Sequence, residues 1–391
     1  MSRRHRVGIR DRTVLVAHPG AELYGSDRVL LESVSAFADA GWSVVAALPV
    51  RGPLVRELED RGARVVIAPT PVLRKSALRP LGFLRLAGEA CRGLWHGWHL
   101  IRAVRPSLVY VSTVTIPLWS VLGRLSRRAV LVHVHEAEAS ARPVVRRLLA
   151  VPMLMAHRIV ANSEFSIGVL TRSAPRLAAR TSVLYNGVVG PAERVEPRTS
   201  IEGPVGLLYV GRLSPRKGVD VAIAAVSLLT AAGCDATLDV VGAVFPGYEW
   251  YETELRAAAR DASISDAVRF RGFQPDVWHF LSQCDIAIVP SRVDEPFGNT
   301  AVEAVLASRP LVVSATSGLR EAAEGYASAR FVTPGDPKAL ADAVLGIRES
   351  WPSVRAAAIE DAALADERHS PDHYRRALLA VVHEVLGTAR E

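Results

Sequence analysis

The stretch DIAIVPSRVDEPFGNTAVEAVLASRPLVVSA, residues 285–315, places a helical pattern between two short runs of apolar and β-branched residues. The first run ends at Pro290, a loop carries Glu295, and residues 297–300 open the helix. A strand, a helix and a second strand in this order are the repeating unit of a parallel α/β sheet. Free N–H groups at the helix start would bind an anion, and Gly298 leaves the backbone open to a ligand. The stretch therefore predicts the fold class, α/β, and a ligand-binding loop at the end of a strand.

The same alternation of strands and helices extends along the whole chain. We predict strands at residues 13–19, 42–49, 63–69, 107–113, 129–136, 158–163, 205–211, 236–242, 268–273, 285–291 and 309–315. Residues 183–204 interrupt the pattern, because they are rich in Gly, Pro and charge and lack periodicity. We therefore predict two α/β domains, residues 1–190 and 191–368, and a helix in residues 369–391 that packs back toward the first domain. Ligands of such sheets lie beyond the carboxyl ends of the strands, so two facing domains would bind between them.

The composition is that of a globular protein with sizeable cores. Of the 391 residues, 49% are hydrophobic and 22% are charged. Cys91, Cys234 and Cys284 stand far apart among apolar neighbours, which predicts buried free thiols in a reducing compartment. The basic start is not followed by the uninterrupted apolar run of a signal peptide, so we expect a cytoplasmic protein.

The net charge of +7 is unevenly distributed along the chain. Residues 1–190 hold 27 Lys and Arg against 12 Asp and Glu, whereas the remainder holds 20 against 28. The first half would attract an anionic partner, unless an arginine-rich coding bias explains the excess. Residues 72–106 combine basic side chains with Phe83, Trp95 and Trp98, which fits either a helix on an anionic membrane surface or a helix packed on the first sheet. The basic residues of this segment are Arg74, Lys75, Arg79, Arg85, Arg92, Arg102 and Arg105.

A second candidate ligand loop is GRLSPRKGVD, residues 211–220. A strand ends at Gly211, and Arg212 and Lys217 follow before the next helix. Two cations at a strand end suit a diphosphate, because each charge-assisted contact contributes about 1.5–3 kcal/mol. A basic surface loop is the alternative interpretation of the same spacing.

Two carboxylates frame the helix start of the opening stretch. Glu295 lies in the loop and Glu303 about a turn into the helix, so both could point into one cleft and accept hydrogen bonds from sugar hydroxyls. Glu303 could instead be a solvated helix residue. Its apolar neighbours, however, favour a carboxylate with a partner.

Together these segments resemble the retaining nucleotide-sugar glycosyltransferases of family four, which have the GT-B fold of two Rossmann-like α/β domains facing across a cleft. The resemblance is carried by GRLSPRKGVD, by EPFGNTAVE (residues 295–303) and by VRFRGFQPDVWHF (residues 268–280), with family-like stretches at ANSEFS and YNGV. It implies that Arg212 and Lys217 bind the donor diphosphate, Glu295 lies by the donor sugar and Glu303 accepts ribose hydroxyls. It also implies contacts to sugar, phosphate and nucleobase from Phe297, Gly298, Asn299, Thr300 and the turn at Phe273.

The first domain adds weaker candidates. His133 and His135 end a predicted strand, where a buried structural histidine is the ordinary interpretation. The resemblance implies that His135 approaches the donor sugar, with His133 as the second choice. The family usually ends its first strand in a Gly-Gly loop; here Gly25 is kept as a ligand-contact candidate, and Tyr24 stands where the other glycine would fall. Ser26 or Asp27 could also cap the helix that follows.

The resemblance implies an enzyme that transfers a sugar from a nucleoside-diphosphate sugar to a hydroxyl acceptor, with retention at the anomeric carbon. We expect no metal or other cofactor, since no Asp-x-Asp motif stands at a plausible position, and the leaving phosphate would take the acceptor proton. The expected partners are the nucleotide-sugar donor, a glycan or lipid-linked glycan acceptor in polysaccharide or glycolipid biosynthesis, and an anionic membrane contacted from its cytoplasmic face. The sugar, the base, the acceptor and the oligomeric state remain open.

Other classes fit less well. The chain lacks a phosphate loop of P-loop type, a dinucleotide fingerprint after its first strand, a Gly-x-Ser-x-Gly elbow and zinc spacing. A nucleic-acid-binding module is disfavoured, because no reader motif accompanies the basic half. A nucleotide-sugar epimerase, a phosphorylase on a similar fold and an inactive sugar-binding relative stay as alternatives.

Overall fold

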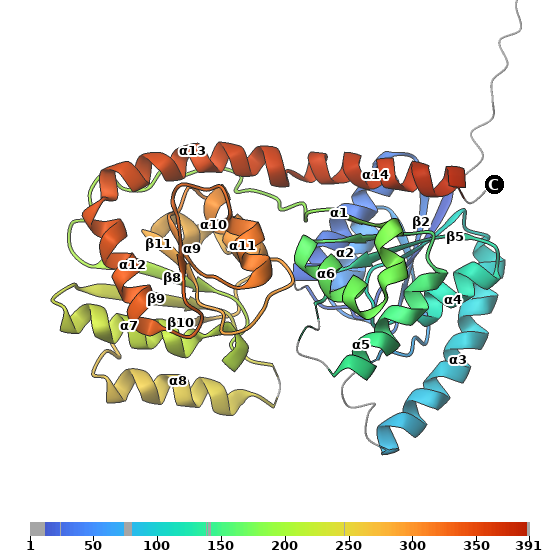
Figure 1. Cartoon of the computed structure of the whole chain (residues 1–391), viewed down its shortest axis with the longest axis horizontal. Coiled ribbons are helices and arrows are strands. Elements are labelled where there is room, and N and C mark those ends of the chain that lie inside the picture. The colour runs from blue at the N-terminus through green and yellow to red at the C-terminus, as the bar shows by residue number, and fades with distance from the viewer. Residues whose placement is uncertain are drawn as a thin grey trace, which may run out of the picture. The chain divides into compact units, whose positions relative to one another are not determined.

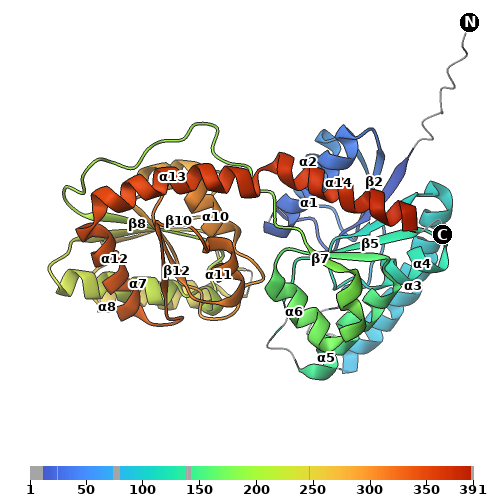
Figure 2. The ribbon, with the colours of Figure 1, turned by 45° about the horizontal axis from the view of Figure 1, so that its top comes forward.

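The computed structural model describes residues 12–23, 25–73, 80–137, 139, 142–245 and 247–388. The chain divides into two compact units, each with its own parallel sheet (Figures 1 and 2). Unit 1 comprises Met1–Gly187 and Pro371–Glu391, and unit 2 comprises Val188–Ser370. Unit 1 is thus made from two separate stretches of chain.

The sheet of unit 1 has seven parallel strands in the order β3-β2-β1-β4-β5-β6-β7. The strands are β1 (Thr13–Ala17), β2 (Ser43–Leu48), β3 (Ala63–Ile67), β4 (Leu108–Val111), β5 (Ala129–Val134), β6 (Arg158–Ala161) and β7 (Thr181–Val183). The central strands are buried on both faces, which is why they read as continuous apolar runs. In register, Val14 of β1 lies between Val44 of β2 and Leu108 of β4.

Helices cover both faces of this sheet and form two cores. They are α1 (Gly25–Asp39), α2 (Leu54–Asp60), α3 (Pro80–Val104), α4 (Leu118–Leu125), α5 (Pro143–Ala150), α6 (Glu164–Ser173), α14 (Pro371–Thr388) and the 3-10 helices η2 (Val151–Met155) and η3 (Pro175–Arg180). Helix α14 packs along α1 and buries Tyr374, Leu378, Val382 and Val385 in the same core (Figures 1 and 2). The other core includes Ile101 of α3.

Unit 2 repeats this architecture with six parallel strands in the order β10-β9-β8-β11-β12-β13. The strands are β8 (Val205–Val210), β9 (Ala236–Val241), β10 (Val268–Gly272), β11 (Ile286–Val289), β12 (Leu311–Ser314) and β13 (Ala329–Val332). The helices are η4 (Pro215–Lys217), α7 (Val219–Ala231), α8 (Glu249–Asp261), α9 (Trp278–Gln283), α10 (Asn299–Leu306), α11 (Ser317–Ala323), α12 (Pro337–Glu349) and α13 (Trp351–His369). In each sheet the first strand is central, and the chain continues first on one side of it and then on the other. Such a reversal opens a crevice beyond the carboxyl ends of the strands, at β1 and β4 in unit 1 and at β8 and β11 in unit 2.

The prediction of two parallel α/β sheets is confirmed. The edge strands β7 and β13, of three and four residues, are not among the predicted strands. The prediction that all three cysteines are buried is wrong for Cys91, which is exposed on α3.

The basic and aromatic segment of residues 72–106 becomes the connection to α3 and α3 itself. Arg74, Lys75 and Arg79 lie outside the described residues, as do the side chains of Phe83 and Arg85. Further along α3, Trp98 packs against the apolar core of the sheet, whereas Trp95 is 60% exposed. Among the helices that the structure describes, none combines the length and the apolar character needed to cross a membrane.

Candidate functional site

The loop after β8 is pressed against the end of β11. Gly218 has a left-handed backbone (φ 71°), and a Cβ atom added there would lie 2.0 Å from the carbonyl oxygen of Pro290. The backbone N–H of Arg292 donates to the carbonyl of Arg216 at 2.9 Å. A glycine is therefore required at 218, and the close approach carries Lys217 to the loop that follows β11.

Lys217 and Glu295, predicted separately from two segments, form an ion pair. The distance from Lys217 Nζ to Glu295 Oε1 is 2.9 Å, and the Oγ of Ser291 donates to the same oxygen at 2.9 Å. The Glu295 side chain is 10% exposed and that of Lys217 is 33% exposed. The carboxylate is thus fixed inside the loop, while the ammonium group still reaches solvent.

Arg212, which follows the end of β8, packs on an aromatic ring. Its guanidinium carbon lies 3.5 Å from the centroid of the Phe245 ring, which follows β9. The hydroxyl of Tyr209 donates to the carbonyl of Arg212 at 2.9 Å. Burial, with the nearby charge of Glu295, raises the pKa of Tyr209 well above its ordinary value, so the phenol remains a neutral donor. Phe245 is a neighbour that sequence reasoning missed.

Helix α10 begins at the crevice, with Gly298 as its N-cap residue. A Cβ on Gly298 would lie 2.5 Å from Leu319 Cδ2, and one on Gly318 would lie 2.2 Å from the carbonyl oxygen of Glu295. Helix α11 is therefore packed directly on the loop. Phe297 is 2% exposed and its ring lies in the core, so only its backbone can meet a ligand. The arrangement places the N-terminus of α10 at the crevice, where the helix dipole favours an anion.

Further along α10, Glu303 is 7% exposed between the buried residues Val302 and Ala304. The alternative of a solvated Glu303 is therefore wrong. Asn299 and Thr300 are partly buried in the first turn of α10. Both glutamates of the opening stretch thus belong to the interior of unit 2.

Glycines end three neighbouring strands of the sheet. A Cβ on Gly242, after β9, would lie 1.9 Å from the carbonyl oxygen of Gly211, after β8. The N–H of Gly242 donates to the carbonyl of Gly272 at 2.8 Å, where β10 ends. Phe273, next in sequence, is 56% exposed. An exposed ring beside a close-packed backbone edge is a suitable surface for a flat ligand group.

In unit 1, His133 and His135 are buried with ring centroids 3.9 Å apart. Burial, with the adjacent His18, lowers the pKa of His135 to about 3, and burial, with His135, lowers the pKa of His133 well below its ordinary value. Both rings are therefore neutral at neutral pH. His133 Nδ1 forms a hydrogen bond with the hydroxyl of Tyr110 at 2.6 Å. Neither nitrogen of His135 has a hydrogen-bond partner among the described residues.

Sequence reasoning missed a third histidine at this edge. His18 directly follows β1; its Nε2 lies 2.7 Å from Asp27 Oδ1, and its Nδ1 lies 2.5 Å from the Oγ of Ser112. The signal was available, because a histidine directly after the first strand of such a sheet lies at the ligand edge. Gly25 is the first residue of α1, while Tyr24 lies outside the described residues.

Among the described residues, no three His, Cys, Asp or Glu side chains gather in a way that would hold a metal ion. The cationic and backbone groups of unit 2 are the ones placed to hold an anionic ligand.

Residues 193–363 match the family model described as glycosyl transferases group 1. The chain is 36% identical over 174 residues to glycogen synthase of Mycobacterium tuberculosis, which covers 43% of this chain and 40% of that protein. It is 26% identical over 361 residues to the 2-deoxystreptamine glucosyltransferase of Streptomyces kanamyceticus, which covers 86% of this chain and 92% of that protein. The chain thus spans only 40% of the length of the mycobacterial relative that it matches at higher identity.

Among solved structures, HepE of Anabaena in complex with UDP and glucose has a TM-score of 0.80 at 21% identity. The match covers 95% of this chain and 99% of that chain. A structure of the same protein in complex with UDP-glucose has a TM-score of 0.78. This likeness shows the fold, GT-B, over nearly the whole chain.

Proposed function

Residues 193–363 match the glycosyl transferases group 1, and on this premise we propose that the chain transfers a hexose from a nucleoside-diphosphate sugar to a hydroxyl acceptor, with retention at the anomeric carbon. The observation that carries the proposal is the meeting of Lys217, Glu295 and the start of α10 at the carboxyl ends of β8 and β11. A cation and a helix N-terminus at one place are suited to a leaving diphosphate.

In this proposal the diphosphate lies between Lys217, Arg212 and the backbone N–H groups at residues 297–300. Lys217 is held by Glu295 and Arg212 by the Phe245 ring, so both cations are oriented before the donor binds. Such preorganised charges stabilise the negative charge that develops on the leaving group. The leaving phosphate, rather than a protein base, takes the acceptor proton.

The remaining candidates are assigned to the rest of the donor. We place Glu295 beside the sugar, Glu303 at the ribose hydroxyls and Phe273 at the nucleobase. These assignments are supported by the burial of both carboxylates and the exposure of the Phe273 ring. His135 of unit 1 is proposed as a sugar contact, since its neutral ring can still donate and accept one hydrogen bond each.

UDP-glucose is the first donor to test, because HepE was solved with it and two of the relatives are named for glucan or glucosyl transfer. The full chain is incubated with UDP-glucose and with other nucleotide sugars, and nucleoside-diphosphate release is measured with and without acceptors. We expect release that depends on an acceptor. An epimerised donor without release would favour an epimerase, sugar phosphate formed from a glycan and inorganic phosphate would favour a phosphorylase, and binding without turnover would favour an inactive relative.

We also propose that unit 1 meets a lipid-linked acceptor at an anionic membrane, from its cytoplasmic face. An apolar stripe on α5 and η2 supports this: Val144, Leu148 and Val151 are 76%, 56% and 53% exposed, and Met155 continues the stripe. Trp95 of α3 is also exposed, and α3, α4, η2 and α5 follow one another as packed neighbours. Together with the basic charge of residues 1–190, this surface fits an anionic lipid face.

The membrane proposal is tested by sedimentation with liposomes that contain an anionic lipid, at low salt. Leu148→Glu should reduce the bound fraction severalfold, because it places a carboxylate in the apolar stripe. Leu228→Glu, at a site 41% exposed on α7 of unit 2, should bind like the wild type. Equal sedimentation of both variants, or no sedimentation of the wild type, would refute docking through this surface.

A further inference from the structure

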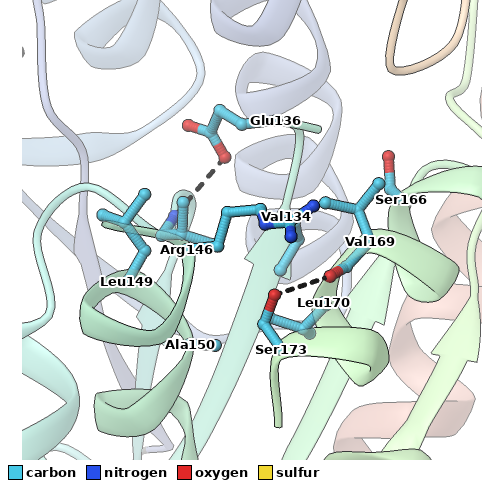
Figure 3. Close-up of a pocket in the computed structure, with 10 residues that line it drawn as sticks. Val134, Glu136, Arg146, Leu149, Ala150, Ser166, Val169, Leu170 and Ser173 are labelled. Atoms are coloured by element: carbon cyan, nitrogen blue, oxygen red, sulfur yellow. Dashed lines mark hydrogen bonds between the residues drawn. The ribbon is translucent and has the colours of Figure 1, made fainter. Parts of the chain in front are cut away.

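Unit 1 contains a small cavity just beyond the carboxyl end of β5. Its volume is about 30 Å³, which admits roughly two groups the size of a water molecule. Val134 of β5, Leu149 of α5 and Leu170 of α6 contribute to a largely apolar wall (Figure 3). Two charged side chains, Glu136 and Arg146, interrupt that wall.

The carboxylate of Glu136 is fixed by three donors. It accepts hydrogen bonds from the hydroxyl of Thr113, from the backbone N–H of Val114 at 3.4 Å and from the backbone N–H of His135 at 3.2 Å. Burial raises the pKa of this carboxyl group, whereas the three donors oppose the rise. Glu136 is thus a preorganised acceptor at the same edge of the sheet as His135.

Arg146 approaches the cavity from α5 with part of its hydrogen-bonding capacity unused. One terminal nitrogen, Nη1, donates to the carbonyl of Ala139 at 3.2 Å. Its Nε is buried and has no acceptor among the described residues. Glu136 and Arg146 are both described, and no ion pair joins them, although Figure 3 shows both side chains lining one pocket.

The buried Nε–H of Arg146 without an acceptor is costly, and the carboxylate of Glu136, held by three donors, can accept a further hydrogen bond. A hydroxyl group can bind to both side chains, because it accepts a hydrogen bond from Arg146 and donates one to Glu136. We propose that this cavity binds a hydroxyl or hydroxymethyl group of the acceptor, between Glu136 and Arg146, so that the acceptor is a neutral polyol such as a sugar or a cyclitol. The identification of the bound polyol as the acceptor rests on the proposed function.

Other ligand groups fit the cavity less well. A phosphate would attract Arg146 but repel the carboxylate of Glu136, and its four oxygens exceed the space of two water-sized groups. An ammonium group would pair with Glu136 but lie against the guanidinium of Arg146. The apolar wall suits the carbon that bears a hydroxyl, since its C–H groups pack against Val134 and Leu170.

The test uses the full chain and two simple polyols, methyl α-D-glucopyranoside and myo-inositol, whose binding is followed by saturation-transfer NMR. Glu136→Gln and Arg146→Met should each weaken polyol binding about tenfold, as expected for a lost hydrogen bond to a charged group. Arg172→Met is the matched control: it removes the same charge from an exposed position on α6. This control should bind the polyols like the wild type.

The outcomes separate the cavity from the donor site. Wild-type-like polyol binding by both cavity variants would overturn the proposal. Inorganic phosphate that displaces the polyols, and loses this ability in Arg146→Met, would overturn it in favour of an anion site. Stabilisation by UDP, measured as a thermal shift on the same samples, shows that each variant is folded. A wild-type chain that binds polyols but is stabilised neither by UDP nor by other nucleoside diphosphates would refute the proposed function and leave the cavity as a polyol site.

Discussion

At the scale of single residues, the Lys217–Glu295 ion pair links the two loops that sequence analysis singled out. Glu295 is nearly buried, and one of its carboxylate oxygens contacts both Lys217 and Ser291. Removal of either member of the pair therefore disturbs the other. Lys217 would lose its orientation without Glu295, and Glu295 would be left as a buried charge without Lys217.

We expect Lys217→Ala to lower kcat for sugar transfer by about 100-fold to 1,000-fold, the usual effect of losing one preorganised group at a developing charge. Glu295→Gln should lower kcat by a similar factor. The measurement is steady-state release of nucleoside diphosphate with a saturating acceptor.

The matched control for Lys217→Ala is Lys338→Ala on α12, an exposed lysine in an ion pair with Asp342. It removes the same charge and should leave kcat within twofold of the wild type. A Lys217→Ala enzyme that performs like this control would contradict the role assigned to Lys217.

The buried histidines predict a pH dependence of stability. The folded-state pKa of His135 is about 3, against an unfolded value near 6.5, so the unfolded chain binds more protons between these values. The free energy of unfolding should therefore fall as pH is lowered from 6.5 toward 3, by up to about 1.4 kcal/mol per pH unit from this group. Urea unfolding at pH 7 and pH 5 measures the fall.

His135→Gln should make that fall smaller, because a glutamine does not titrate. His133, whose pKa is also lowered, still contributes to the fall in the free energy of unfolding in this variant. An identical fall in wild type and His135→Gln would show that His135 does not titrate with the low pKa that its burial implies.

At the scale of elements, the connection from β8 to α7 is held in place by one glycine. Gly218 and Gly233 have nearly the same left-handed backbone, with φ values of 71° and 75°. A Cβ on Gly233 meets nothing within 4 Å, whereas one on Gly218 would lie 2.0 Å from the carbonyl of Pro290. Alanine variants at the two positions therefore distinguish the strain of a left-handed backbone from the cost of a steric clash.

Gly233→Ala should reduce the free energy of unfolding by about 1 kcal/mol, the cost of a left-handed alanine. Gly218→Ala should cost more, because the loop must also move away from the end of β11. It should also raise the KM for the donor, since Lys217 precedes Gly218. Urea unfolding and steady-state kinetics of both variants check this, and equal effects would mean that the loop adjusts freely.

Most elements could be predicted from the sequence because central parallel strands are buried on both faces and read as unbroken apolar runs. Edge strands β7 and β13 lack that signal: Thr181, Ser182 and Val183 are all partly exposed, and Phe331 of β13 is 39% exposed. The family resemblance of residues 211–220 and 295–303 is confirmed by the model that matches residues 193–363.

The side-chain contacts of the candidate site were harder to predict. Strand order brings His18 to Ser112, which lie 94 positions apart in the chain. The Lys217–Glu295 pair likewise depends on the adjacency of β8 and β11, which spacing within either motif does not encode. The cavity at Glu136 and Arg146 arises from the packing of α5 and α6 against the end of β5, a result of tertiary structure.

At the scale of the whole molecule, every group assigned to the diphosphate belongs to unit 2, which is one continuous stretch of chain. We therefore expect the fragment Val188–Ser370 to fold alone and to bind a nucleoside diphosphate. Circular dichroism and a thermal shift with UDP measure both properties, and Lys217→Ala in the fragment should abolish the shift. A folded fragment that shows no thermal shift with UDP would indicate that unit 2 alone is not sufficient to bind this diphosphate.

Unit 1, by contrast, combines residues that precede unit 2 in the chain with residues that follow it, so its two parts are synthesised at different times. The face of α1 that packs on Tyr374 and Leu378 leaves the ribosome early, but α14 follows only after all of unit 2 has been made. At ordinary rates of translation, the interval between the end of α1 at Asp39 and the start of α14 at Pro371 is roughly 15–70 s. For this time a growing chain carries an uncovered apolar face, which makes α1 the place where a nascent-chain chaperone would bind and where unit 1 is most open to misassembly.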